Sequence, residues 1–372
     1  MAQKILKPAR QKKLKRLLKI SASSVSRVEK CPASASLDLK LKDKYRYFAF
    51  KDAADYGTLV HKAGEDLVVK GWLSDEIDAT IEAHPRKEDM LYSADFYARA
   101  INRIRLDNEM DGEAENKFRA TINGVDCVAK CDYRLVHEKG VVVADLKTGR
   151  FDYSESAHKQ CFFAALLWLH ENPIKGVTFY EIETVTIQPM YYDEARRVVR
   201  DKSVLTMEQI KSLLHTYTET VKQGAKVFNV AEHCKFCPSI LICPEVQNKI
   251  KEVFEMAKKA TKEDVKFKDL LVMQPAIDAW FEACADYMTR EMEAGKVIPG
   301  VQLTDANGHR RWIDPAFVAE KLAYLKDKIY EPRKLKTPAQ VEKIAGKHEI
   351  EGLFETPKIK KLALVENPFD GV

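Results

Sequence analysis

The sequence predicts an α/β fold, with a central mixed sheet flanked by helices and a mainly helical C-terminal extension. Apolar and polar residues alternate over residues 115–120 and 125–136, and Asn123-Gly124 between them is a hairpin turn signal. A short buried strand is predicted at Val141–Ala144, and a strand with β-branched alternation at Val177–Ile187. Because segments with helical spacing surround and separate these strands, we expect strands and helices in one α/β fold.

The helices are predicted from apolar spacing and from capping residues. Ser21–Ser24 offers N-cap residues for a short helix that Cys31-Pro32 ends. Leu59, Val60, Ala63 and Leu67 have helical spacing within residues 56–69. Further helices are predicted over 92–109, from Ser154 or Ser156 to His170, and over 207–222.

The chain is expected to have three parts: a basic arm (1–20), a main domain (21–248) and a C-terminal helical and hairpin module (249–372). In the last part, residues 267–294 are predicted to be helical with a break near Pro275. Residues 301–313 suggest a hairpin around Asn307-Gly308.

The composition is that of a soluble globular protein, with 45% hydrophobic and 31% charged residues among 372. The longest apolar run, Cys161–Leu169, is about half of the ~20 residues that a membrane span needs. No signal peptide is recognisable either, because no apolar stretch follows the basic N-terminus. We therefore expect a cytoplasmic protein without a membrane partner.

Positive charge is concentrated at the N-terminus, although the formal net charge is only +5. Between Lys4 and Lys19, eight residues are Lys or Arg and none is acidic. Such an arm can neutralise phosphates and steer the protein to DNA. The alternative is a solvated, frayed terminus.

The main chemical signal is Asp132 followed by Asp145-Leu146-Lys147. Asp145 and Lys147 end one predicted strand and, two residues apart, project from the same face. A neighbouring strand can bring Asp132 beside them. Two carboxylates suit Mg²⁺ or Mn²⁺, which polarises a phosphate and activates water, and the ammonium suits the developing negative charge. The alternative is a solvated strand end with a surface ion pair.

The order of these residues resembles the RecB-type branch of the PD-(D/E)XK nucleases. The matching residues are Gly57-Thr58-Leu59-Val60-His61, Gly124 with Asp132, Asp145-Leu146-Lys147-Thr148-Gly149, and Gln160. The similar stretch runs from about Cys31 to Cys243, and the motifs are specific as an ordered set. The resemblance implies a restriction-endonuclease-like core with His61, Asp132 and Asp145 as Mg²⁺ or Mn²⁺ ligands, Lys147 as the catalytic lysine, and Gln160 ordering the active site or the DNA.

The same resemblance implies a metal-dependent deoxyribonuclease. Exonuclease action on the ends of single- or double-stranded DNA is favoured. The layout is also similar to nuclease-like proteins of phages and prophages. This similarity implies a role in phage recombination or DNA processing in a bacterial host cytoplasm. A phage recombination or single-strand annealing protein is the partner class, and an oligomer is compatible with that role.

Three positions around this motif set leave alternatives open. Where the family has a Tyr four residues after the Gln, this chain has Ala164, so a hydrogen-bonding or DNA-stacking contact is absent or supplied elsewhere. His61 alone on an amphipathic helix would more often be a half-buried residue than a ligand. Glu65, one helical turn further on, is an extra ligand candidate or an orienting partner.

The eight cysteines fall into two groups. In a cytosolic chain they are not expected to form disulfides. Cys234-x2-Cys237-x5-Cys243 is a compact thiolate cluster, and Cys31 is the natural fourth partner because it also precedes a Pro. The remaining four are predicted to be core residues or thiols without a role: Cys127, Cys131, Cys161 and Cys284.

One cysteine upstream and three downstream of the motifs resembles the iron–sulfur members of this nuclease branch, which include AddB-type subunits and CRISPR adaptation nucleases. The resemblance implies a [4Fe–4S] cluster bound by Cys31, Cys234, Cys237 and Cys243. Such a cluster would close a loop of about 200 residues and staple the domain together. The alternatives are a zinc site with four cysteine ligands, a zinc site in which His233 replaces one cysteine, and plain core cysteines.

Near the C-terminus, Gly308-His309-Arg310-Arg311-Trp312 places cations beside an aromatic residue, which suits DNA contact or a hairpin with a packed Trp. Two rival functions remain for the whole chain. One is a catalytically inactive, Fe–S-stabilised DNA-binding or recombination scaffold. The other is a zinc-stabilised interaction protein.

Overall fold

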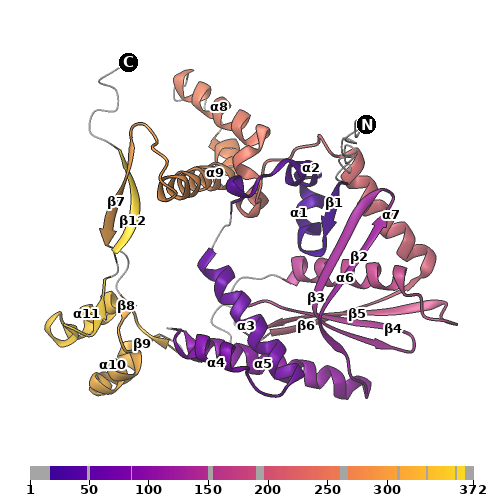
Figure 1. Cartoon of the computed structure of the whole chain (residues 1–372), viewed down its shortest axis with the longest axis horizontal. Coiled ribbons are helices and arrows are strands. Elements are labelled where there is room, and N and C mark those ends of the chain that lie inside the picture. The colour runs from indigo at the N-terminus through magenta and orange to yellow at the C-terminus, as the bar shows by residue number, and fades with distance from the viewer. Residues whose placement is uncertain are drawn as a thin grey trace, which may run out of the picture.

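A six-stranded mixed sheet forms the centre of the main domain (Figure 1). The computed structural model describes residues 17–47, 51–84, 86–149, 154–189, 197–259, 267–307, 311–331, 334–356 and 358–364. The sheet strands are β1 (Lys19–Ser21), β2 (Glu113–Ile122), β3 (Val125–His137), β4 (Gly140–Leu146), β5 (Phe179–Gln188) and β6 (Arg197–Thr206).

The strand order is β1-β3-β4-β5-β6, and β2 pairs with the other edge of β3. β1 runs beside the first half of β3, at Asp126–Val128, and β4 beside the second half, at Tyr133–His137. β4 and β5 are parallel, and helix α6 (Ser154–Glu171) forms the crossover that a parallel pair requires. The predicted mixed sheet is confirmed, and it places the end of β4 at the centre of the domain.

Helices cover both faces of the sheet. On one face α1 (Val25–Lys30), α6 and α7 (Met207–Gln223) pack with the sheet around one apolar core. On the other face, α3 (Lys51–Val69), α4 (Asp75–Glu82) and α5 (Lys87–Asn108) enclose a second core (Figure 1). The helices predicted around residues 25–30, 56–69, 92–109, 154–170 and 207–222 are all present.

The predicted hairpin between β2 and β3 is also present. Asn123 and Gly124 have φ values of 51° and 73°, and Ile122 pairs with Val125 across them. Both turn residues occupy the left-handed region, which Asn and Gly tolerate and which a two-residue hairpin turn requires. This register fixes every later pairing between the two strands.

Four elements of the main domain were not predicted: β1, α2 (Ala33–Lys40), α4 and β6. β6 is an edge strand whose alternating residues are largely polar, so the segment lacks the apolar signal that identified β4 and β5. β1 and α2 are too short to show a period, and α2 directly follows Cys31-Pro32, where the sequence predicted only an ending.

Helices α8 (Pro244–Lys259) and α9 (Phe267–Glu293) lie next to the cysteine region (Figure 1). The predicted break at Pro275 is wrong, because α9 continues through it. Pro275 removes one N–H donor. The residues after it, Ala276, Ala279 and Ala283, are buried in the apolar cluster that contains Cys234 and Cys237, and this packing holds the helix together.

The predicted hairpin at residues 301–313 is also wrong. β7 (Val301–Asn307) pairs with β12 (Lys358–Leu364), and β8 (Arg311–Trp312) pairs with β11 (Phe354–Glu355). The turn signal at Asn307-Gly308 was therefore overridden by pairing with a distant strand, and Gly308 itself lies outside the described residues. The remaining C-terminal elements are α10 (Pro315–Lys321), β9 (Tyr330–Glu331), β10 (Lys334–Leu335) and α11 (Pro338–Ala345).

A small apolar core of Val318, Leu322, Ile329, Val341 and Ile350 holds this last part of the chain together. Among the described helices, none combines the length and the apolar character that a membrane crossing requires.

Candidate functional site

The carboxylate site lies where β3 passes from β1 to β4. We use this name for His61, Glu115, Asp132, Asp145, Lys147 and Gln160. Cys131 belongs to one apolar core and Tyr133 to the other, so the regular alternation of β3 is broken at Asp132. Glu115, which lies across from Asp132 in the β2–β3 register, has a φ of 51°. Such local irregularities re-aim side chains beside functional sites.

Asp132 receives contacts from α3 and from β4. Nδ1 of His61 lies 3.1 Å from its Oδ1, and the amide of Leu146 donates to its Oδ2 at 2.7 Å. Burial opposes the charged form of His61, but the hydrogen bond and charge of Asp132 outweigh it, so the pKa of His61 is raised. Burial likewise opposes the charge on Asp132, but His61, the Leu146 amide and Lys147 lower its pKa. Asp132 is thus held as a carboxylate.

Asp145, Lys147 and Gln160 form a closed set of contacts. Nζ of Lys147 lies 2.7 Å from Oδ2 of Asp145 and donates to Oε1 of Gln160 at 3.0 Å. Nε2 of Gln160 donates to Oδ1 of Asp145 at 2.8 Å. Burial raises the pKa of Asp145; Lys147 opposes that rise, and the charge of Asp132 adds to it. Burial lowers the pKa of Lys147, but the charge of Asp145 outweighs it and the pKa is raised.

Glu115 completes a potential cation site that the sequence argument missed. One ligand atom each from His61, Glu115 and Asp132 lies within 4.8 Å of the other two. Two carboxylate oxygens and one imidazole nitrogen fit Mg²⁺ or Mn²⁺ chemistry. Glu65 lies near Glu115, and burial raises the pKa of Glu65 with a contribution from the Glu115 charge, but Glu65 is not part of this group.

Thr148 and Gly149, which follow Lys147, contact helix α3 and strand β5. A Cβ atom on Gly57 would lie 3.0 Å from Oγ1 of Thr148, so glycine allows α3 to approach this segment closely. On the other side, buried Gln188 donates from Nε2 to the carbonyl of Gly149 at 2.7 Å. Gln188 was also missed, because it ends a strand and belongs to no motif.

Ala164, one turn after Gln160 on α6, is fully buried in the apolar core. A tyrosine side chain would not fit there without displacing core residues. The side-chain contact that the resemblance implies at this position is therefore absent from it.

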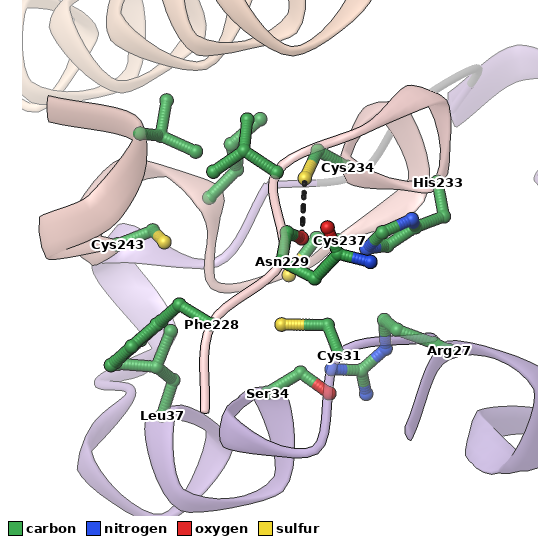
Figure 2. Close-up of a pocket in the computed structure, with 13 residues that line it drawn as sticks. Arg27, Cys31, Ser34, Leu37, Phe228, Asn229, His233, Cys234, Cys237 and Cys243 are labelled. Atoms are coloured by element: carbon green, nitrogen blue, oxygen red, sulfur yellow. Dashed lines mark hydrogen bonds between the residues drawn. The ribbon is translucent and has the colours of Figure 1, made fainter. Parts of the chain in front are cut away.

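The cysteine hollow is the second candidate site, and it is defined by Cys31, Cys234, Cys237 and Cys243. Figure 2 shows their side chains around one cavity. Cys31 follows α1, whereas the other three come from the 3-10 helices η3 (Glu232–Phe236) and η4 (Ile240–Ile242) and the residues directly after them. All four cysteines are buried, and His233 also lines the cavity.

Three of these thiols share one electrostatic pattern. Burial raises the pKa of Cys234 to about 11, that of Cys237 to about 12, and that of Cys243. Backbone hydrogen bonds oppose this rise: from Ala231 to Cys234, from Ser239 to Cys237, and from Glu245 and Val246 to Cys243. The hollow therefore disfavours thiolates without a cation and already directs donors at the sulfurs.

The sulfur atoms of Cys31, Cys234, Cys237 and Cys243 do not form a compact group. Among the residues that the structure describes, His61, Glu115 and Asp132 form the only group of three His, Cys, Asp or Glu ligand atoms within 4.8 Å of one another. No three of the cysteine sulfurs, and no pair of them with His233, come that close.

The other sequence predictions are placed as follows. Cys127, Cys131 and Cys161 are buried in the sheet core, and Cys284 is partly buried on α9. Nε1 of Trp312 donates to the carbonyl of Lys336 at 2.8 Å, so this ring is packed within its own region. His309 and Arg310, and residues 1–16 of the basic arm, lie outside the described residues.

Comparison with solved structures gives matches of low structural similarity, among them two crystal structures. The crystal structure of SSO0001 has 15% sequence identity and a TM-score of 0.30, over 62% of this chain and 88% of that one. The crystal structure of a candidate exonuclease from Eubacterium rectale has 11% identity and a TM-score of 0.34, over 56% of this chain and 82% of that one.

A comparison with curated proteins gives no significant match. A family profile does match, over residues 18–365, and its description is "Protein of unknown function (DUF2800)". This match covers both the carboxylate site and the cysteine hollow. The chain therefore belongs to the DUF2800 family.

Proposed function

We propose that the protein is a Mg²⁺- or Mn²⁺-dependent DNA nuclease of the RecB-type PD-(D/E)XK class. The observation that carries this proposal is the position of the His61, Glu115 and Asp132 ligand atoms, within 4.8 Å of one another, beside the linked Asp145, Lys147 and Gln160. The motif order alone supplied five of these six residues. Glu115 supports the proposal independently, because the motif order did not include it.

Each residue has a role in phosphodiester hydrolysis. His61, Glu115, Asp132 and Asp145 would hold the cation, which polarises the phosphate and lowers the pKa of a bound water. Lys147 is largely buried, and its ammonium is held by Asp145 and Gln160, so it is placed to orient water or to stabilise developing negative charge. Gln160 fixes both Asp145 and Lys147 and therefore orders the site.

The substrate is proposed to be DNA, with its ends favoured. The basic arm between Lys4 and Lys19 supplies eight cations that can neutralise phosphates. A role in phage recombination or DNA processing, alone or with a single-strand annealing protein, follows only from the resemblance of the motif order.

DNA digestion by anaerobically purified protein tests the activity. Linear and circular DNA, single- and double-stranded, would be incubated with Mg²⁺, with Mn²⁺ and with a chelator. We expect metal-dependent loss of linear DNA that Asp132→Asn abolishes and the exposed control Asp111→Asn retains. Cutting of the circles would identify an endonuclease instead. DNA binding without any cutting would favour the scaffold function.

The cysteine hollow is proposed to hold a [4Fe–4S] cluster. A zinc ion with Zn–S bonds of about 2.3 Å places its sulfurs roughly 3.8 Å apart. The cysteine sulfurs here are more widely spread, because no three of them lie within 4.8 Å of one another. A cluster, in which each cysteine binds a different iron, fits that spread.

Metal and sulfide analysis of the same preparation tests the cofactor. Iron and inorganic sulfide in equal amounts, with a broad absorbance near ~400 nm from thiolate-to-iron charge transfer, is the expected result. Zinc without iron would overturn the cluster assignment and leave the nuclease proposal in place.

A further inference from the structure

Three buried polar atoms that line the cysteine hollow lack a hydrogen bond of normal geometry: Oγ of Ser34, Nη1 of Arg27 and Nε2 of His233. The first two are donors, and the Arg27 guanidinium also interacts with the Cys237 thiol. Ser34 and Arg27 both line the cavity, and Figure 2 shows them on the side where Cys31 lies. An unpaired buried donor costs about 1–3 kcal/mol, and a charged donor costs more. A bound group that accepts these hydrogen bonds would relieve this cost.

Arg27 is fixed in this position by a carboxylate. Its Nη2 lies 2.7 Å from Oδ2 of Asp38, and Oδ1 of Asp38 accepts from Oγ of Ser239 at 2.5 Å. Ser239 is two residues after Cys237, so Asp38 ties the guanidinium to the cysteine loop. The guanidinium also lies beside the Cys237 thiol, whose pKa rise through burial it opposes. Asp38 therefore anchors the guanidinium beside Cys237, and Nη1 faces the hollow without a hydrogen bond of normal geometry.

Ser34 is positioned by the backbone next to Cys31. Its amide donates to the carbonyl of Cys31 at 3.0 Å, so the turn at the start of α2 sets the hydroxyl close to this cysteine. The residue is almost fully buried, with 1% of its surface exposed. A serine in a helix normally turns its hydroxyl to water or to a carbonyl one turn earlier. This hydroxyl does neither.

The acceptors that fit both donors are sulfur atoms of an anionic cluster. Four thiolates around an oxidised [4Fe–4S]²⁺ core carry a net charge of −2, which becomes −3 when the cluster gains one electron. Donors to the sulfurs stabilise the more negative state more strongly, and they raise the reduction potential. A guanidinium has a larger effect than a hydroxyl because it is charged.

We infer that the cluster is redox-active, and that Arg27 and Ser34 raise its reduction potential by donating hydrogen bonds to its sulfur atoms. This inference rests on the proposed cluster, and it assigns that cluster a function beyond stapling the domain. The redox step transfers one electron from an external reductant to the [4Fe–4S]²⁺ core, which becomes [4Fe–4S]⁺, and no bond or proton moves.

A mediated redox titration of the full-length, anaerobically purified protein tests the inference. Cluster absorbance and the paramagnetic resonance of the reduced state would be followed in wild type, Arg27→Gln and Ser34→Ala. At a fixed potential, the ratio of reduced to oxidised cluster should fall on the order of tenfold in Arg27→Gln, which is about 59 mV for one electron. It should fall on the order of threefold in Ser34→Ala, whose donor is neutral.

Two control variants distinguish a specific effect on the reduction potential from a general loss of structure. Ser36→Ala is on the same helix, but its hydroxyl donates to the carbonyls of Ala33 and Ala225, away from the hollow. Arg119→Gln removes an exposed arginine that pairs with Asp126 on the sheet. Both should keep the wild-type potential.

The outcomes distinguish this inference from the proposed cofactor. Full iron and sulfide content with unchanged potentials in both variants would overturn the redox inference and leave the cluster. A wild type that holds no iron after purification and reconstitution would overturn the cluster itself. If Arg27→Gln fails to fold, the result for Ser34→Ala decides.

Discussion

The carboxylate site and the cysteine hollow lie in one chain but are built in opposite ways. In the carboxylate site the polar groups satisfy one another: Asp132 accepts from His61 and Leu146, and Asp145, Lys147 and Gln160 form a closed set. In the hollow, buried thiols have raised pKa values, and three buried polar atoms of Arg27, Ser34 and His233 lack a hydrogen bond of normal geometry. The first site therefore pairs most of its charged groups within the protein, although Oδ2 of Asp145 lacks a hydrogen-bond donor, whereas the second leaves several buried polar groups without partners.

Because of this difference, we expect ligand loss at the carboxylate site to affect catalysis and ligand loss at the cysteine hollow to affect stability. Removal of the cation should stop catalysis and leave the fold intact, because the carboxylate site keeps its internal contacts. Removal of the cluster should destabilise the domain, because four buried cysteines from two distant segments then lose what joins them. Each of the following predictions tests one side of this contrast.

The largest effect is expected from Lys147→Ala. Its ammonium is the only cation in contact with Asp145 among the described ion pairs, so in the proposed mechanism its loss would remove charge stabilisation from the transition state. We expect single-turnover DNA cleavage to slow by about 10²–10³-fold or more. Lys139→Ala, an exposed lysine at the β3–β4 turn, is the matched control and should cleave normally. Equal rates for the two variants would remove Lys147 from the mechanism.

Cys31→Ala should have the largest effect on stability. Cys31 would be the one ligand of the proposed cluster from the N-terminal segment, so its loss would open the connection across about 200 residues and should lower the unfolding free energy by about 2–5 kcal/mol. Denaturant unfolding under anaerobic conditions measures this change. Cys284→Ala, at a partly buried cysteine on α9, should leave the cluster and the stability nearly unchanged. A cluster that survives in Cys31→Ala would contradict the ligand assignment.

Glu115→Gln should weaken cation binding by about 10- to 100-fold without loss of the fold. Glu115 offers one of the three ligand atoms within 4.8 Å of one another, and the amide keeps the size of the side chain but not its charge. Calorimetric titration with Mn²⁺ measures the affinity. Glu65→Gln is the matched control, because Glu65 is close to Glu115 but outside the group. A larger loss in Glu65→Gln would reassign the ligand.

The smallest effect concerns Asp66, on the helix that carries His61. Asp66 accepts hydrogen bonds from Ser74 at 2.8 and 2.6 Å and pairs with Lys70 at 2.7 Å. Burial opposes its charge, but these contacts outweigh burial and lower its pKa. The folded pKa is thus below the unfolded value, so the contribution is full above about pH 4 and is lost as pH falls through the folded pKa.

Asp66→Asn should therefore lower the unfolding free energy by about 1–2 kcal/mol at pH 7, with a smaller difference from wild type below about pH 4. Denaturant unfolding at several pH values measures this. Asp55→Asn, at an exposed position on the same helix, is the control. A difference that stays constant down to about pH 3 would show that the carboxylate charge is not responsible.

The sequence predicted the sheet well where strands were buried or joined by a tight turn. β4 and β5 are apolar enough to be recognised, and Asn123-Gly124 fixes the β2–β3 hairpin. β6 was missed because an edge strand needs no apolar face, and the pairing of β7 with β12 joins segments about fifty residues apart. Local signals such as Asn307-Gly308 cannot show a long-range pairing.

The candidate sites show the same limit. The motif order predicted His61, Asp132, Asp145, Lys147 and Gln160, and the structure brings these residues together. Glu115 could have been found by counting back from the turn, because the pairing of Ile122 with Val125 sets Glu115 opposite Asp132. Ser34 and Arg27 could not have been found, because an unpaired buried donor is a property of packing and leaves no sequence pattern.

Metal-dependent cleavage of end-labelled linear duplex DNA by the anaerobically purified wild type tests the central claim most directly. The same sample would be assayed for DNA binding and for iron content. We predict that Mg²⁺ or Mn²⁺ releases labelled product and that a chelator of divalent cations stops this release without loss of DNA binding. Protein that holds its cluster, binds the duplex and releases nothing with either cation would contradict the claim and identify a DNA-binding scaffold.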